Sequence, residues 1–82
     1  MYYVYILKSQ KTGRYYVGAT ENIENRLKEH NNGKSKSTRP FAPYEMVYQE
    51  ICQSLCDARK REKYIKSKKS RRFIDRLIGV GI

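Results

Sequence analysis

The chain has 82 residues, of which 18 are Lys or Arg and 8 are Asp or Glu, so its net charge is +10. A chain this short buries only about 60–65% of its unfolded surface when it folds, and we expect a single domain over residues 1–82 with its functional site in a surface groove. The positive charge favours a polyanionic partner. A membrane surface is disfavoured because the basic residues have no broad apolar helix face beside them.

The first two elements are predicted to be strands. Residues 2–8 are rich in aromatic and β-branched side chains, and residues 14–18 repeat this composition after a group of turn-forming residues. The short connection favours an antiparallel hairpin. If residues 9–12 form the loop, Tyr5 lies directly opposite Tyr16, and opposed side chains project from the same face of a sheet.

A helix is predicted next, over residues 22–31. Thr20 or Asn22 can serve as its N-cap, and Gly33 suits the left-handed position after its end. Residues 33–43 contain glycine, proline, serine and threonine without an apolar pattern, so we expect a loop there.

The second half of the chain is predicted to contain one strand and two helices. Alternating apolar residues predict a strand over residues 45–51, a helix over residues 55–67 begins after the capping residue Ser54, and a short helix covers residues 71–78. The order is therefore ββαβαα. An α+β fold, with a three-stranded antiparallel sheet flanked by helices, is the economical packing of these elements.

The segment between Arg59 and Arg76 is dense in basic residues and contains only Glu62 and Asp75 as acids. Such a field attracts phosphate backbones and speeds the encounter with them. The candidate contacts to a nucleic acid in this segment are Arg59, Lys63, Lys66, Lys68 and Lys69.

Glu62 lies on the same predicted helical face as the apolar residues Ala58 and Ile65. One interpretation is a structural salt bridge with the cations around it. The other is a carboxylate that holds one Mg²⁺ or Mn²⁺ ion at a groove, because magnesium is often held by one or two carboxylates and completes its shell with water and phosphate oxygens.

Arg26 and His30 are four residues apart on the predicted first helix, so they lie one above the other. A guanidinium here could bind a phosphate through two hydrogen bonds and stabilise charge that develops on phosphorus; otherwise Arg26 is a solvated surface residue. For His30 the alternatives are a packing or capping group, a proton carrier, and a hydrogen-bond partner for a phenol.

The chain has eight tyrosines, two phenylalanines and no tryptophan. This composition is typical of a small core in which tyrosine rings are buried while their hydroxyls remain in contact with water. Tyr5 and Tyr16 differ from the others because they would share one face of the hairpin. A phenol has an ordinary pKa near 10, too high for a base at neutral pH. A mechanism that uses one as a base therefore needs the positive field of Arg26, the basic helix and a metal ion to lower that pKa.

Cys52 and Cys56 are the only cysteines, and His30 is the only histidine. A structural zinc site needs about four ligands, so we expect no zinc. Two cysteines make no disulfide framework, and the sequence shows no signal peptide or bilayer-spanning apolar run. These features predict an intracellular, reducing and cytoplasmic location.

Two tripeptides resemble the motifs that give the GIY-YIG endonuclease family its name. Tyr3-Val4-Tyr5 is similar to the first and Tyr16-Val17-Gly18 to the second. The resemblance covers roughly residues 2–70 and is closest to the small, stand-alone bacterial members. It places the family's arginine on Arg26, its common histidine on His30 and its metal-binding glutamate on Glu62. It also implies a three-stranded antiparallel sheet flanked by helices, in agreement with the elements read from the sequence.

The chain departs from the family pattern at two points. Tyr3 replaces the glycine of the first tripeptide, at a position that does not carry the chemistry. Many active members also place an asparagine after the glutamate helix, whereas no asparagine follows Asn32 in this chain. A Lys or Ser within residues 66–70 could take its place.

The resemblance implies a metal-dependent endonuclease that hydrolyses phosphodiester bonds in nucleic acid, with DNA favoured over RNA. Glu62 would hold one Mg²⁺ or Mn²⁺ ion, Tyr5 or Tyr16 would activate the attacking water, and Arg26 would stabilise the transition state. His30 would polarise a tyrosine or shuttle protons. Thr38 and Arg39 would contact the backbone from the loop. A protein partner could supply specificity, which so small a chain has little surface to provide.

Two alternatives remain at this point. The first is a nucleic-acid-binding module with a relic site, supported by the missing asparagine and by a basic surface that suffices for affinity without cleavage. The second is an accessory protein bound to RNA or to ribosomes, in which tyrosines stack on unpaired bases. We rank the second lowest because most of the rings are expected in the core.

Overall fold

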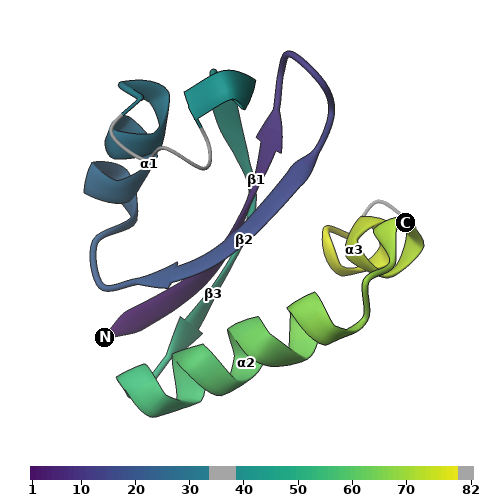
Figure 1. Cartoon of the computed structure of the whole chain (residues 1–82). Coiled ribbons are helices and arrows are strands. Elements are labelled where there is room, and N and C mark those ends of the chain that lie inside the picture. Colours follow the sequence, from purple (N-terminus) through teal and green to yellow (C-terminus); the bar gives the residue numbers. More distant parts are fainter. Residues whose placement is uncertain (34–38, 80–82) are drawn as a thin grey trace.

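A computed structural model describes residues 1–33 and 39–79 of the chain, and only the backbone of Arg39. Figure 1 shows the elements in chain order: β1 (Tyr2–Ser9), β2 (Tyr15–Thr20), α1 (Ile23–Asn31), the single 3₁₀ turn η1 (Arg39–Phe41), β3 (Tyr44–Cys52), α2 (Leu55–Ser67) and α3 (Arg71–Leu77). The predicted α+β architecture with the order ββαβαα is confirmed. In these described ranges no helix has the length and apolar character needed to cross a bilayer.

The three strands form one antiparallel sheet in the order β2-β1-β3. The predicted pairing of Tyr5 with Tyr16 is wrong by two residues, because Tyr5 pairs with Gly18 and Leu7 pairs with Tyr16. The cause is a longer turn, in which the Ser9 N–H donates to the Arg14 carbonyl and Gly13 takes a φ of 78°. A shift of two keeps every side chain on its face, so Tyr5 and Tyr16 still share one.

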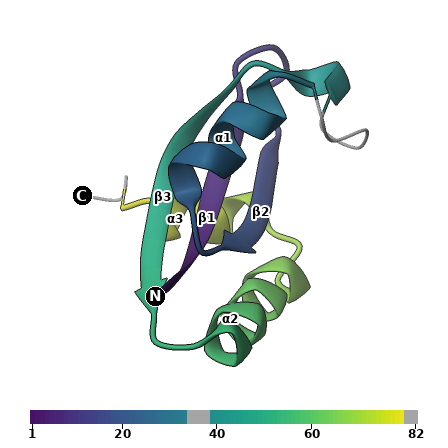
Figure 2. The ribbon, with the colours of Figure 1, turned by 90° about the vertical axis from the view of Figure 1, so that its left-hand side faces the viewer.

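The sheet is covered on both faces. In Figure 2, α1 lies in front of the sheet, α3 lies behind it and α2 runs below. The buried core on the α1 side is formed by Tyr5, Leu7 and Tyr44. The core on the other side is formed by Val4, Ile6, Val17, Ala58 and Ile65, and the last two belong to α2.

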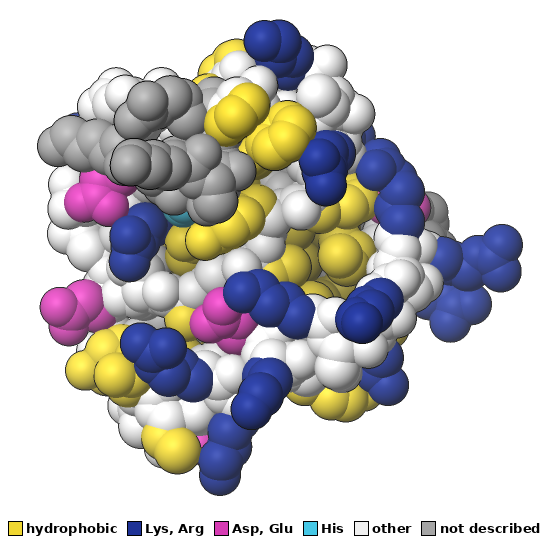
Figure 3. Space-filling view, in the orientation of Figure 1, with side chains coloured by type: hydrophobic (Ala, Val, Ile, Leu, Met, Phe, Trp, Pro, Cys, Tyr) yellow, Lys and Arg dark blue, Asp and Glu magenta, His cyan; other side chains and the backbone are white. Residues whose placement is uncertain are grey.

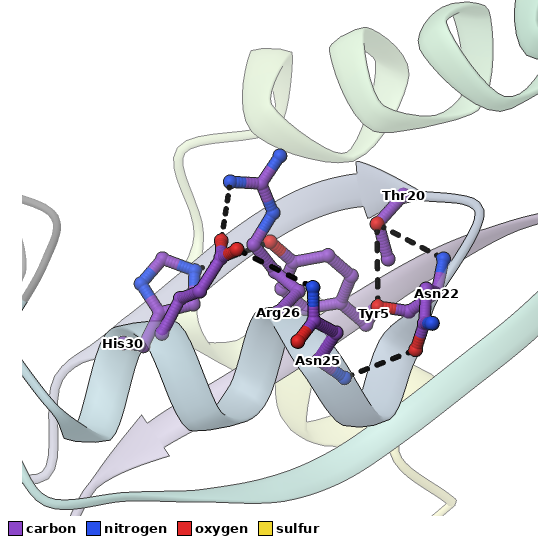
Figure 4. Close-up of polar contacts among 7 residues, drawn as sticks. Tyr5, Thr20, Asn22, Asn25, Arg26 and His30 are labelled. Carbon is purple, nitrogen blue, oxygen red and sulfur yellow. Dashed lines mark hydrogen bonds and ion pairs between the residues drawn. The ribbon is translucent and has the colours of Figure 1, made fainter.

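The helix ends follow the capping residues of the sequence. Asn22, rather than Thr20, caps α1, because its side chain accepts a hydrogen bond from the Asn25 N–H (Figure 4). Gly33 follows the helix with a φ of 74°, as predicted. Ser54 accepts from the Asp57 N–H and starts α2 at the predicted residue. These caps fix where the two site-bearing helices begin.

Candidate functional site

Tyr5 lies at the centre of the site, on the central strand, and only 2% of it is exposed. A hydrogen bond of 3.3 Å joins its hydroxyl to Nε2 of His30. The phenol passes directly over Gly18 of β2: a Cβ built there would lie 2.6 Å from Cζ of Tyr5 and closer still to the hydroxyl oxygen. The absence of a side chain on Gly18 is therefore what lets Tyr5 reach across the edge strand.

The pKa of Tyr5 shifts in the direction opposite to the one that a base requires. Burial, followed by the neighbouring phenol of Tyr16, raises its pKa above the ordinary value, and the positive charge of Arg26 opposes this only in part. Desolvation thus outweighs the lowering by the nearby cation. Tyr5 is a neutral phenol at neutral pH, suited to hydrogen bonding rather than to accepting a proton.

Tyr16 is the more exposed of the two phenols and lies on the edge strand β2. The centroid of its ring lies 4.8 Å from that of His30, in an edge-on contact, and 6.4 Å from that of Tyr5. The centroid of the Tyr44 ring lies 6.0 Å from that of His30, also in an edge-on contact. Tyr5 and Tyr16 therefore meet around one imidazole, as their shared face predicted.

His30 is 2% exposed, at the end of α1. Burial, and then the charge of Arg26, lowers its pKa below the ordinary value, while Glu29 acts in the opposite sense. The imidazole is accordingly neutral at pH 7. Asn31, the next residue, holds this end of the helix to β3, since its side chain donates to the Tyr44 carbonyl at 3.3 Å and accepts from the Tyr44 N–H at 2.6 Å.

Arg26 lies one turn before His30, and 45% of its side chain is exposed. Figure 4 shows Arg26 and His30 on neighbouring turns of α1, on the side of the helix where Tyr5 of β1 lies. The guanidinium forms an exposed ion pair with Glu29 at 3.3 Å. Exposed pairs of this kind contribute about 0–1 kcal/mol, so a phosphate can readily displace the Glu29 carboxylate.

Glu62 projects from α2, the helix that packs on the opposite face of the sheet from α1. Its side chain is 20% exposed, and its Oε2 accepts a hydrogen bond of 2.7 Å from Nζ of Lys66. The salt bridge that the sequence allowed is thus present. The negative charge of Glu62 also raises the pKa of Tyr5.

A divalent ion would have to be held here by a single protein carboxylate. Among the described residues no group of three or more His, Cys, Asp or Glu side chains lies close enough to share a metal. One partly exposed carboxylate beside a basic groove nevertheless fits Mg²⁺ or Mn²⁺, which complete their shells with water and phosphate oxygens. Lys66 would have to release Oε2, and an exposed i,i+4 pair is weak enough to allow this.

Basic side chains surround Glu62, in agreement with the predicted basic helix. Arg59, Lys63 and Lys66 line a hollow together with Glu62, and Lys69 lines a second hollow next to Tyr16. The Lys68 ammonium instead lies over the Tyr64 ring, 4.6 Å from its centroid. Of the predicted loop contacts, Thr38 and the side chain of Arg39 lie outside the described residues.

Sequence reasoning missed two positioning residues. Gly18 was recognised only as part of a tripeptide, and its role emerges only when the strand pairing places it beneath Tyr5. Asn31 carried no signal at all, since its partner is the backbone of a residue 13 positions away. Backbone partners of this kind leave no pattern in the sequence.

Comparison with known proteins agrees with this fold. Residues 1–74 match the family described as the GIY-YIG catalytic domain. A UPF0213 protein of Clostridium perfringens is 48% identical over 67 residues, which cover 80% of this chain and 71% of the relative. A UPF0213 protein of Bacillus licheniformis is 42% identical over 78 residues, which cover 94% of this chain and 78% of the relative.

A solved structure is also similar. The solution NMR structure of a UPF0213 protein from Bacillus halodurans is 34% identical and superimposes with a TM-score of 0.60, covering 98% of this chain and 85% of that one. The sheet with its three helices is therefore shared with a protein of the same group.

Proposed function

The chain belongs to the GIY-YIG family, as its motifs predicted, and we propose that it is a divalent-metal-dependent endonuclease whose substrate is DNA. Domains of this family are in general nucleases. The observation that supports the proposal is the cluster at Tyr5: His30 binds its hydroxyl, the Tyr16 ring packs edge-on against His30, and Arg26 lies one turn before His30 on α1.

The two phenols take different roles because their burial differs. Tyr16 is partly exposed and would be the base. Its phenolate, formed by loss of the phenol proton to solvent, would take a proton from the attacking water while the water oxygen bonds to phosphorus, the phosphorus–oxygen bond to the leaving group breaks and the leaving oxygen takes up a proton from solvent. Tyr5 is buried and protonated, and with neutral His30 it holds the Tyr16 ring in position. Arg26 leaves Glu29 and binds the phosphate through its guanidinium, where it stabilises the negative charge that develops.

Glu62 is the residue that would hold the metal. A bound Mg²⁺ or Mn²⁺ ion supplies Lewis-acid polarisation of the phosphodiester and neutralises its charge. Lys66, one turn further along α2, takes the place of the asparagine that many family members carry, because once released from Glu62 its ammonium can bind a phosphate oxygen.

The cellular setting and the source of specificity also belong to the proposal. We place the protein in a reducing cytoplasm, where the thiols of Cys52 and Cys56 would stay reduced. The small surface near the site leaves little area for sequence readout, so a protein partner would supply specificity.

A binding module with a relic site is the second candidate. The observation that favours it is the 2.7 Å contact of Lys66 with Glu62, which occupies a carboxylate oxygen that a metal would need. Only the nuclease predicts a product that depends on a divalent ion.

A cleavage assay distinguishes the two. Purified protein is incubated with duplex, single-stranded, flap and branched DNA in Mg²⁺, in Mn²⁺ and in EDTA. We expect cleavage only with metal, and its loss in Glu62→Gln and Tyr16→Phe, whereas Glu45→Gln, an exposed acid on β3, retains wild-type cleavage. Wild-type protein that binds these DNAs and leaves all of them intact would identify the relic module.

A further inference from the structure

A second hollow opens beside the candidate site, between β2, α2 and the start of α3, with a volume of about 420 Å³. Tyr16 and Lys66 are among its lining residues, so the hollow adjoins the candidate site. Figure 3 shows hydrophobic surface inside a hollow near the middle of this face, with Lys and Arg side chains around it. The apolar lining is formed by Tyr15, Val17, Ile65 and Ile74 on the α2 face, together with Tyr16, whose ring packs with Tyr5 on the α1 face. The basic rim is formed by Arg14, Lys66, Lys69 and Arg71.

One of the rim cations, Arg71, is held in place by its contacts, and a second, Lys69, has a constrained backbone. Lys69 has a φ of 46°, the left-handed conformation that costs a residue with a Cβ about 1–2 kcal/mol. A lysine therefore occupies a position between α2 and α3 whose backbone conformation glycine would adopt at a lower energetic cost. The guanidinium of Arg71 lies 4.7 Å above the Tyr15 ring and donates to the Gly13 carbonyl at 2.9 Å. The positive rim is therefore partly preorganised by the fold.

An apolar lining inside a cationic rim suits one kind of ligand. A duplex presents phosphates and sugars outward and keeps its bases stacked, so it would leave the apolar lining empty. An unpaired nucleotide offers a base to the apolar and aromatic lining and its phosphates to the rim, which is how proteins bind single strands. The apolar part of the hollow therefore matches the base of an unpaired nucleotide, and the basic rim matches its phosphates.

We propose that the hollow binds an unpaired base next to the scissile phosphate, so that the protein acts on single-stranded DNA or on a single-stranded arm. The inference rests on the proposed function for the scissile phosphate, but the binding preference itself does not require cleavage. It makes the hollow a specificity site, with Tyr16 as the residue shared between recognition and chemistry.

Binding without metal tests the proposal separately from catalysis. Fluorescence anisotropy in EDTA compares three labelled probes: an oligothymidylate of about 12 nucleotides, an abasic deoxyribose-phosphate strand of equal length, and a hairpin duplex with a similar number of phosphates. We expect the thymidylate to bind at least about fivefold more tightly than the abasic strand, and more tightly than the duplex. Equal affinity for the first two probes, or a preference for the duplex, overturns the proposal.

A rim variant provides the second measurement. Lys69→Gly removes one cation and relieves the left-handed backbone, so a loss of binding cannot be attributed to unfolding. The dependence of log K on log salt for the single strand should become shallower by about 0.7, while Lys60→Ala, on the exposed face of α2, changes it less. If the slope of log K against log salt is unchanged in Lys69→Gly, Lys69 does not contact the nucleic acid and the proposed rim is wrong.

The two proposals fail in different ways. Selective binding of base-bearing single strands without any cleavage rejects the nuclease and keeps the hollow. If the protein cleaves duplex DNA with metal but binds the thymidylate and abasic strands equally well, the proposed base site is rejected and the nuclease proposal stands.

Discussion

The phenol of Tyr5 lies directly over the Cα of Gly18, its partner across the β1–β2 ladder. This contact lets a residue of the central strand present its hydroxyl at the sheet edge, where side chains from α1 and α2 can both approach it. The glycine is needed here for space and not for a special backbone conformation, because only Gly13, Gly33 and Gly79 among the described glycines have a positive φ.

Gly18→Ala should therefore destabilise the fold and disturb the site together. The added methyl group would overlap the Tyr5 ring, and we expect a loss of about 1–3 kcal/mol in the free energy of unfolding, measured by urea denaturation. In a Tyr5→Leu background the same substitution should cost clearly less, because the two residues are in contact. Equal costs in both backgrounds would show that the clash with Tyr5 is not the cause.

His30 should give the protein a distinctive dependence of stability on pH. Its pKa is lowered in the folded state by burial and by Arg26, so near pH 6 and below the unfolded chain binds more protons than the folded one. Stability is then fully present above the unfolded pKa of about 6.5 and is lost as the pH falls below it. Urea denaturation between pH 7.5 and 5.5 should show this decline.

The control uses the fact that the chain has only one histidine. His30→Gln should be less stable at pH 7.5, because the Tyr5 hydroxyl loses its partner Nε2, yet its stability should vary much less across the same range. If the free energy of unfolding of His30→Gln falls with pH as steeply as that of the wild type, other titratable groups cause the decline.

Much of this site could be predicted from the sequence, and the exceptions have physical causes. The tripeptide motifs, the helix caps and the period of the strands sufficed to put Tyr5 and Tyr16 on one face and to bring Arg26 and His30 near them. The strand register was missed because it depends on the length of the turn after Ser9. The direction of the Tyr5 pKa shift, which decides against Tyr5 as the base, could not be predicted because it depends on the degree of burial, which outweighs the nearby charges.

The Glu50–Arg61 ion pair should hold α2, and with it Glu62, against the sheet. Arg61 donates to both carboxylate oxygens of Glu50, at 3.1 and 3.0 Å, and Tyr48 donates to the same carboxylate at 2.5 Å. Arg61→Ala should lower the free energy of unfolding by about 1 kcal/mol, since the pair is partly exposed, and should reduce cleavage further than that loss of folded protein explains. Lys60→Ala, at the preceding exposed position, should change neither quantity.

Removal of the Lys66 ammonium should strengthen metal binding. If Glu62 holds the metal as proposed, a divalent ion would compete with Nζ of Lys66 for the carboxylate, and the two cations would repel one another. Because an exposed i,i+4 pair contributes only about 0.3–0.5 kcal/mol, we expect Lys66→Gln to bind Mn²⁺ a few-fold more tightly in a calorimetric titration. The Glu62→Gln variant should lose this binding altogether, which would locate the ion on the carboxylate.

Under the proposed mechanism Lys66→Gln should nevertheless cleave more slowly, because the same ammonium moves to the phosphate when the metal arrives. Tighter metal binding together with unchanged cleavage would leave Lys66 as a simple competitor for Glu62 and would assign the role of the missing asparagine to another residue.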